Sequence, residues 1–241
     1  MHDAHIHIHD KELVTVMNQH HIPCLVNAST PTEYMFLKEL QKFHPMMKIC
    51  AGIHPWSAQQ LSMQDMKDVL DEVSFIGEIG MDSVWCDVDL QIQKDMLIKQ
   101  LEYASNHQLP VILHTKGMEE EILSCIKQYK NTYLVHWYSC KDHLQGYIEE
   151  GCYFTIGVSV GVDDAVSAVA THAPLNRILL ETDGMDAVEW AWNQKVSYKE
   201  YPEVLKRSLK TIASIRNMDV EALEKQMDEN YQRFIKLGKN R

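Results

Sequence analysis

The sequence predicts a single (β/α)8 barrel, a TIM barrel, over residues 1–241. Eight short apolar, often β-branched runs recur along the chain, and apolar residues at helical spacing fill several of the intervals between them. The length of 241 residues and the apolar content of 45% fit one such barrel, which typically needs about 250 residues, better than two small domains. Metal-binding types of side chain also stand at the ends of several runs, and a parallel barrel brings its strand ends to one rim.

The apolar runs predict the strands, and the spacing between them predicts the helices. The strands are expected near residues 4–8, 24–28, 48–53, 74–79, 110–114, 132–136, 153–158 and 177–182. Helical spacing flanks the fifth strand over residues 92–104 and 118–126. Two further helices, over residues 205–212 and 220–234, are expected to cover the outside of the barrel, and residues 185–201 are expected to form a long loop at its rim.

Composition limits the classes of function. A formal net charge of −11 provides no overall attraction for polyanions, although two bound divalent cations would add positive charge locally. No window approaches the roughly 18 apolar residues of a membrane span, and no basic and then apolar segment opens the chain, so we expect a cytoplasmic protein without membrane contact. The six cysteines form no Cys-x-x-Cys pair and are expected to be buried free thiols. No obligate protein partner is evident.

Six side chains at the ends of apolar runs are candidate metal ligands: His5, His7, Glu78, His114, His136 and Asp183. Two residues apart on a strand, the first two imidazoles point to the same side, as binding to one ion requires. Each residue alone has an ordinary explanation: the start of the chain is rich in His, and an Asp after a strand often caps a helix. Glu78 is the hardest to explain structurally, because an unpaired carboxylate in an apolar strand is unfavourable.

Together, four His, one Glu and one Asp suit two divalent cations. Imidazole favours zinc, whereas carboxylates also accept magnesium and manganese, so the sequence permits all three ions. A carboxylate that bridges the two ions is the natural role for Glu78.

The motifs resemble those of the TatD family of metal-dependent deoxyribonucleases, within the amidohydrolase-like barrels. They run from one end of the chain to the other: Asp3-Ala4-His5-Ile6-His7, Gly52-Ile53-His54-Pro55, Gly77-Glu78-Ile79-Gly80-Met81-Asp82, Pro110-Val111-Ile112-Leu113-His114, His136, Glu181-Thr182-Asp183, and Asn230 with Phe234.

The resemblance implies a metal-dependent hydrolase that cleaves phosphodiester bonds. It implies that His5, His7 and Asp183 hold one ion, that His114 and His136 hold the other, and that Glu78 lies between them. Asp183 and Glu78 would be the catalytic carboxylates, with Asp183 taking a proton from the attacking water. His54 and Lys116 would contact the substrate, which is DNA or another phosphodiester and is bound transiently.

Three departures from the family pattern weaken the assignment of DNA. Lys116 stands where the family usually has Arg, so a point charge replaces a planar two-pronged phosphate ligand. Gly184 follows Asp183 in place of a Ser or Ala, and no Arg occurs between there and Arg207. Cys140 stands where a Gly is common.

Three other functions remain open. A small-molecule amidohydrolase or lactonase would use the same metal-activated water. A noncatalytic metal-binding relative would keep the ligands and have lost its substrate. The run Gly157-Val158-Ser159-Val160-Gly161 matches a serine hydrolase nucleophile motif, but no His follows His172, so the order Ser, acid, His would have to fit into one short segment.

Overall fold

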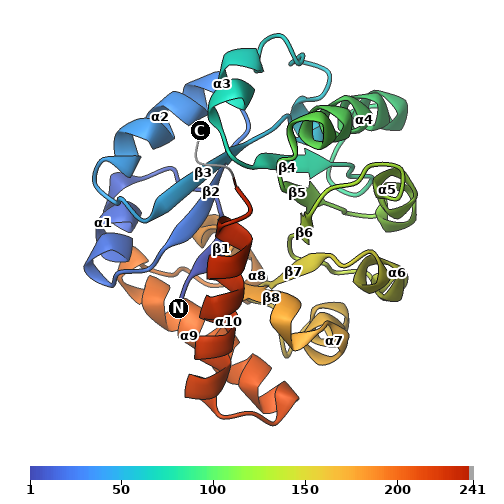
Figure 1. The fold of residues 1–241 in the computed structure, drawn as a ribbon. Helices are drawn as coiled ribbons and strands as arrows, with labels where there is room; N and C mark the ends of the chain where they lie inside the picture. The colour runs from blue at the N-terminus through green and yellow to red at the C-terminus, as the bar shows by residue number, and fades with distance from the viewer. Residues whose placement is uncertain (239–241) are drawn as a thin grey trace.

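The computed structural model describes residues 1–238 and confirms the predicted (β/α)8 barrel (Figure 1). Sequential strands pair in parallel, in the order β1 to β8. Every predicted strand overlaps an observed one, and their ends agree within two residues. The last three residues of the predicted 1–241 domain lie outside the described part. The strands are β1 Asp3–Ile6, β2 Cys24–Ala28, β3 Met47–Ala51, β4 Ile76–Gly80, β5 Val111–His114, β6 Tyr133–Val135, β7 Tyr153–Ile156 and β8 Ile178–Leu180.

Helices surround the strands, and several begin at capping side chains that the sequence supplies. Asp10, Thr30, Asp89, Asp163 and Asp219 each accept a hydrogen bond from a backbone N–H in the first turn. No helix within residues 1–238 is long and apolar enough to cross a membrane. The α-helices are α1 Lys11–Gln19, α2 Pro31–Gln41, α3 Lys67–Glu72, α4 Leu90–His107, α5 Glu119–Ile126, α6 Leu144–Glu149, α7 Asp164–His172, α8 Met185–Trp192, α9 Tyr201–Arg216 and α10 Val220–Ile235; the 3-10 turns are η1 Pro55–Ser57, η2 Leu175–Arg177 and η3 Tyr198–Glu200.

The core has two parts. A large cluster packs the outward faces of the strands against the helices. A smaller cluster takes one apolar side chain from each strand or its start, and such a set can meet only inside the barrel. Its members are Ala4, Leu25, Cys50, Phe75, Ile112, Leu134, Tyr153 and Leu179, joined by Tyr231 and Phe234 of α10.

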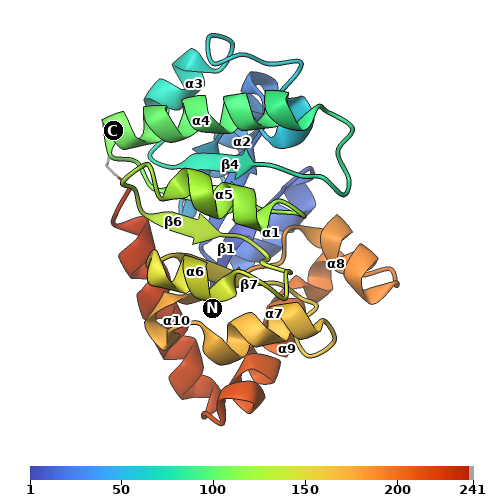
Figure 2. The same ribbon diagram turned by 90° about the vertical axis from the view of Figure 1, so that its right-hand side faces the viewer.

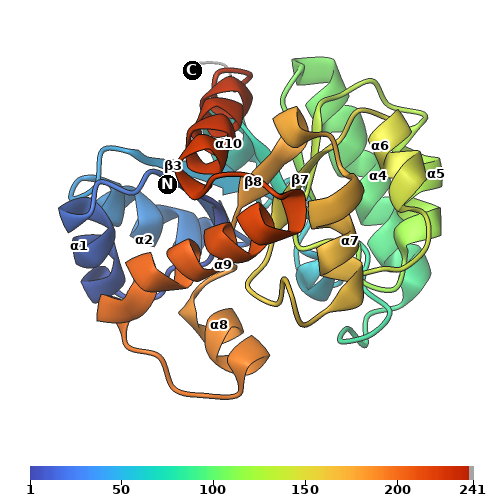
Figure 3. The same cartoon turned by 90° about the horizontal axis from the view of Figure 1, so that it is seen from below.

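The two final helices therefore have different positions, which corrects the expectation that both cover the outside. Helix α9 covers the outside of the barrel, between α1 and α7 (Figure 3). Helix α10 closes the end where the strands begin, because Phe234 lies with its ring centroid 5.6 Å from Phe75 and 5.2 Å from Tyr153. In Figure 2 the strand arrowheads point to the side of α8, and α10 lies on the opposite side. The end where the strands finish thus stays open.

The expected rim loop over residues 185–201 is wrong for its first half. Residues Met185–Trp192 form α8, and η3 follows at Tyr198–Glu200. Met185 and Val188, three residues apart, are buried and fix one face of the helix. The segment still lies at the open rim of the barrel.

The last strand joins the first through side chains as well as backbone. Asp183 N donates to His5 O at 3.1 Å, which places the two candidate ligands side by side. The buried Asp3 carboxylate accepts hydrogen bonds from Thr182 N at 3.1 Å, Thr182 Oγ1 at 2.7 Å and Tyr201 Oη at 2.9 Å. Burial raises the pKa of Asp3 to about 7, against these hydrogen bonds. Asp3 therefore stabilises the closure of the barrel.

All six cysteines are free, as predicted, and four are buried: Cys24, Cys50, Cys125 and Cys152. Cys86 and Cys140 are partly exposed, so the expectation of burial holds for four of the six. Burial raises the pKa of the Cys24 and Cys50 thiols well above the ordinary value, so both stay protonated.

Candidate metal centre

The ends of five strands and the residues that follow them bring all six candidate ligands together. His5, Glu78 and His114 lie within β1, β4 and β5. His7 and His136 directly follow β1 and β6, and Asp183 lies three residues after β8. Five of the six line one open cavity of about 800 Å³, and the sixth, His5, lies fully buried behind it. The sequence could not show the mutual distances, which decide what the group can bind.

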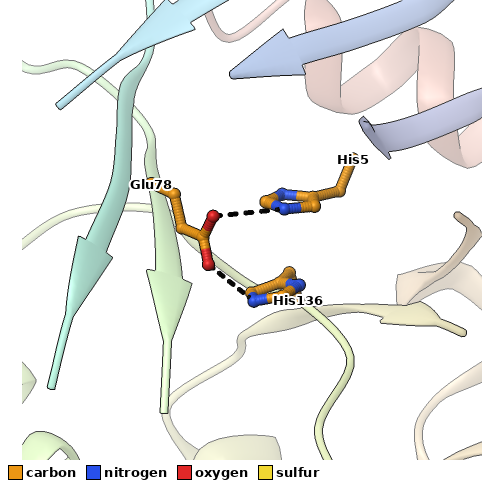
Figure 4. A group of neighbouring side chains, drawn as sticks. All are labelled: His5, Glu78 and His136. Carbon is orange, nitrogen blue, oxygen red and sulfur yellow. Dashed lines mark ion pairs between the residues drawn. The ribbon is translucent and has the colours of Figure 1, made fainter. Parts of the chain in front are cut away.

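Glu78 lies at the centre of the group, with its two carboxylate oxygens facing different partners. Its Oε2 is 3.4 Å from His5 Nε2 and 3.2 Å from His7 Nε2. Its Oε1 is 2.7 Å from both His114 Nδ1 and His136 Nε2. Figure 4 shows the carboxylate between the rings of His5 and His136, with one oxygen toward each. The side chain is only 2% exposed, so water cannot replace these partners.

Asp183 completes the donor set on the Oε2 side. Its Oδ1 lies 3.2 Å from His5 Nε2 and 3.7 Å from His7 Nε2. The donor atoms of His5, His7 and Asp183 all lie within 4.8 Å of one another, as do those of His5, Glu78 and His136. Imidazole nitrogens and carboxylate oxygens at such separations fit a divalent transition ion, zinc included.

His54 lies closer to this centre than the sequence indicated. Its Nε2 is 3.6 Å from Glu78 Oε1, and its donor atom groups with those of Glu78 and His114 within 4.8 Å. Burial lowers the pKa of His54, which keeps its imidazole neutral. The ring therefore borders the donor group on the Oε1 side as well as the cavity.

The electrostatics of the group favour positive charge at its centre. Burial alone would lower the pKa of His7, but the hydrogen bond with Glu78 and the charge of Asp183 raise it to about 9. His136 behaves alike: the charge of Glu78 outweighs burial and raises its pKa well above the ordinary value. Conversely, burial would raise the pKa of Glu78, but the charges of His136 and His5 hold it well below its usual range. Protonated imidazoles here occupy the place that a cation would take.

Two buried carboxylates, Asp82 and Glu181, lie behind the candidate ligands, and their roles were not predicted from the sequence. Asp82 Oδ2 is 3.1 Å from His114 Nε2, the ring nitrogen that faces away from Glu78. Glu181 Oε2 is 3.7 Å from His136 Nδ1, and among the described residues neither atom has a hydrogen-bond partner. A metal-bound imidazole commonly donates its second N–H to a carboxylate, and both acids are placed for that contact. In the sequence, Asp82 and Glu181 lie in the same motifs as Glu78 and Asp183, and this proximity was the available indication of such a role.

His5 has a different neighbour, Asn27 of β2. Asn27 Nδ2 lies 3.0 Å from His5 Nδ1, and Asn27 Oδ1 accepts a hydrogen bond from the Cys50 thiol at 2.6 Å. An amide in the otherwise apolar strand Cys24–Ala28 was the only sequence signal for this contact.

Lys116 and a group of aromatic residues line the mouth of the cavity. Lys116 Nζ donates to Ser139 Oγ at 3.0 Å and lies 4.6 Å from the centroid of the Trp85 ring. Among the residues that line the cavity, Lys116 is the one Lys or Arg. The expectation that it contacts substrate stays a prediction, as it does for His54.

The serine hydrolase alternative lacks its histidine. Ser159 Oγ accepts a hydrogen bond from Trp137 Nε1 at 3.1 Å, and within residues 1–238 no histidine is hydrogen-bonded to it. The Gly-x-Ser-x-Gly run therefore has another use in this fold.

Known proteins resemble the chain in sequence and in fold. A sequence model of the family described as "TatD related DNase" matches residues 2–236. "Uncharacterized metal-dependent hydrolase YjjV" of Escherichia coli (strain K12) is 25% identical over 174 residues, which is 67% of each chain. "3'-5' ssDNA/RNA exonuclease TatD" of Erwinia billingiae (strain Eb661) is 26% identical over 202 residues, or 78% of this chain and 77% of that one. The crystal structure of YjjV, a TatD homologue from Escherichia coli K12, shares the fold with a TM-score of 0.83 and 20% identity over 97% of both chains.

Proposed function

The chain belongs to the TatD family of metal-dependent hydrolases, and we propose that it hydrolyses phosphodiester bonds in DNA with two divalent cations. One observation carries the proposal: the two oxygens of Glu78 face two separate sets of imidazoles at the bottom of one open cavity. A carboxylate in that position can bridge two ions. In two-metal hydrolysis, bound ions lower the pKa of a water and neutralise charge on the phosphoryl oxygens.

The chain's own residues supply the remaining steps. His5, His7 and Asp183 would hold one ion and His114 with His136 the other, with Glu78 shared. Asp183 lines the cavity, where its carboxylate would accept the proton of the attacking water. The charges of His136 and His5, with a hydrogen bond from His5, hold the pKa of Asp183 below its usual value against burial, so the carboxylate is ionised before the reaction.

Lys116 at the mouth of the cavity supports a phosphodiester as the substrate. Lys116 places a positive charge at the mouth, where it can pair with a phosphate that flanks the cleaved bond. The relative named as an exonuclease is described as acting on single-stranded DNA and RNA, which supports a single-stranded nucleic acid as the substrate here.

A small-molecule amidohydrolase or lactonase is the second candidate. Lys116 is the one Lys or Arg lining the cavity in the described chain, and the net charge is −11, so a long polyanion gains little attraction away from the metal centre. A compact carbonyl substrate would need no more charge than the centre provides. A noncatalytic role is the third candidate and has less support, because all six donors are in place.

Cleavage of end-labelled single-stranded DNA tests the proposal. Metal-stripped protein is assayed with magnesium, manganese or zinc restored, beside Asp183→Asn, which keeps the size of the side chain. Metal-dependent cleavage that is absent from the variant supports a phosphodiesterase. If no ion restores cleavage although the protein binds metal, and a lactone is turned over, the second candidate replaces the first.

A further inference from the structure

Four tryptophans line the cavity, and among these four only Trp56 has an indole hydrogen bond that ties it to the metal centre, from Nε1 to Asp82 Oδ2 at 2.9 Å. Trp56 lies in η1, Trp85 in the loop after β4, Trp137 two residues after β6 and Trp190 in α8. Trp85 is 51% exposed and Trp190 is 66% exposed. Water-exposed indoles are unfavourable, and their clustering at one cavity indicates a ligand that covers them.

Three of the four form one continuous group. The ring centroid of Trp190 lies 5.7 Å from that of Trp85 and 6.5 Å from that of Trp137, in edge-to-face arrangements of 80° and 67°. These three residues, Trp85, Trp137 and Trp190, are called the tryptophan cluster below. In each edge-to-face pair, the ring that presents its edge keeps both of its faces clear of that contact, and a further planar group can stack on such a face.

The Gly-x-Ser-x-Gly run fixes one member of the cluster. A Cβ at Gly157 would lie 2.5 Å from Trp137 Cδ2, so only glycine leaves room for the indole. Two residues later, Ser159 accepts the hydrogen bond from the indole N–H. The motif therefore holds Trp137 in place at the cavity.

Asp82 links the cluster to the metal centre. Its Oδ1 accepts hydrogen bonds from the backbone N–H groups of Val84 and Trp85, each at 2.8 Å, and its Oδ2 lies 3.1 Å from His114 Nε2. The same loop is tied to Lys116, because Ser83 N donates to Lys116 O at 3.0 Å. These hydrogen bonds therefore fix the position of Trp85 relative to His114 and Lys116.

We propose that the tryptophan cluster, with Lys116 beside it, stacks an unpaired nucleobase next to the phosphate that is cleaved. The inference rests on the proposed function and assigns the residues that would bind a base of its substrate. Indole faces recognise a planar ring, and an ammonium 4.6 Å from the Trp85 ring centroid pairs with the phosphate that accompanies it. Bases inside a duplex are stacked on both sides, so only a single strand or an unpaired end can occupy this subsite.

Two oligomers test the subsite: oligothymidylate and a phosphodiester oligomer of the same length whose units are abasic. Trp85→Ala, Trp85→Phe and the control Phe36→Ala are compared with the unmodified protein, since Phe36 is 42% exposed on α2 and does not line the cavity. We expect Trp85→Ala to raise KM for oligothymidylate roughly 5- to 100-fold with little change in kcat, the range for loss of one stacked base. Trp85→Phe should recover most of the affinity, and the abasic oligomer should not distinguish any of the proteins.

Equal effects of Trp85→Ala on both oligomers, or no effect on either, would overturn the inference while the proposed function stands. If the unmodified protein cleaves neither oligomer with any ion, the proposed function fails first. Tryptophan fluorescence then decides the subsite: quenching by thymidine monophosphate but not by deoxyribose 5-phosphate, lost in Trp85→Ala, supports it. Equal quenching by both ligands, or by neither, overturns it.

Discussion

Glu181→Gln offers a sharp test of how the metal centre is held. Glu181 is fully buried, and its Oε2 lies 3.7 Å from His136 Nδ1, which has no hydrogen-bond partner among the described residues. If His136 binds metal through Nε2, the carboxylate orients the ring and raises its basicity. The amide keeps the shape and removes the charge.

The expected loss can be given a size. Removal of a partner behind a ligand typically lowers metal affinity by about 10- to 100-fold, or about 1.4–2.7 kcal/mol. At a fixed, saturating metal concentration, the stabilisation by metal falls by the same amount. In a chain of this length, each kcal/mol shifts Tm by roughly 2–4 °C, so the metal-induced rise in Tm should shrink by about 3–10 °C.

Thermal unfolding with and without metal measures the difference directly. The matched control is Glu229→Gln, which makes the same chemical change at an exposed position of α10. A metal-induced rise in Tm for Glu181→Gln equal to that of the control would refute the assigned role. Direct competition with a metal chelator should give the same ranking of affinities.

Other positions give independent tests. Glu78→Gln should lower hydrolysis by more than the roughly 100-fold typical of residues that act through a ligand, and should reduce the number of ions bound per chain by metal analysis. Asp3→Ala leaves buried donors such as the Thr182 hydroxyl without an acceptor, so the free energy of unfolding in denaturant should fall by about 3 kcal/mol or more. Burial lowers the pKa of His2 below its ordinary 6.5, so the free energy of unfolding should decrease as pH falls from 6.5 through the pKa of the folded state. His2→Asn should reduce the difference in the free energy of unfolding between pH 8 and pH 5, measured in denaturant. The pKa of His7, raised to about 9, means that metal binding at pH 7.5 should release protons, which calorimetry in two buffers of different ionisation enthalpy detects as a difference in heat.

The sequence singles out six side chains that the structure brings together, because each lies at the end of an apolar run and the barrel gathers separate strand ends at one rim. The roles of Glu181 and Asp82 were not predicted, because each role depends on which ring nitrogen of His136 or His114 faces the carboxylate. Such orientation is a property of packing and leaves no pattern in one sequence.

Two element positions were missed for similar reasons. Helix α8 has only eight residues, from Met185 to Trp192, so its helical pattern covers about two turns. It follows Gly184, whose φ of 95° is a conformation that favours glycine. Helix α10 has an ordinary amphipathic pattern, and that pattern shows only that one face is buried. It could not show that Phe234 packs into the barrel end rather than onto its side.

The concentration of buried carboxylates explains why the centre requires a cation. Glu78, Asp82 and Glu181 are buried among the imidazoles of the site, beside the partly exposed Asp183, and burying charge in this way is unfavourable unless it is paired. In the metal-free protein the raised pKa of His7 gives a proton that role; this contribution to stability is complete below pH 6.5 and is lost as pH rises to about 9. Metal affinity changes in the opposite sense over the same range, because the competing proton leaves. His7 therefore contributes least to the stability of the metal-free protein at alkaline pH, where it is most available to bind metal.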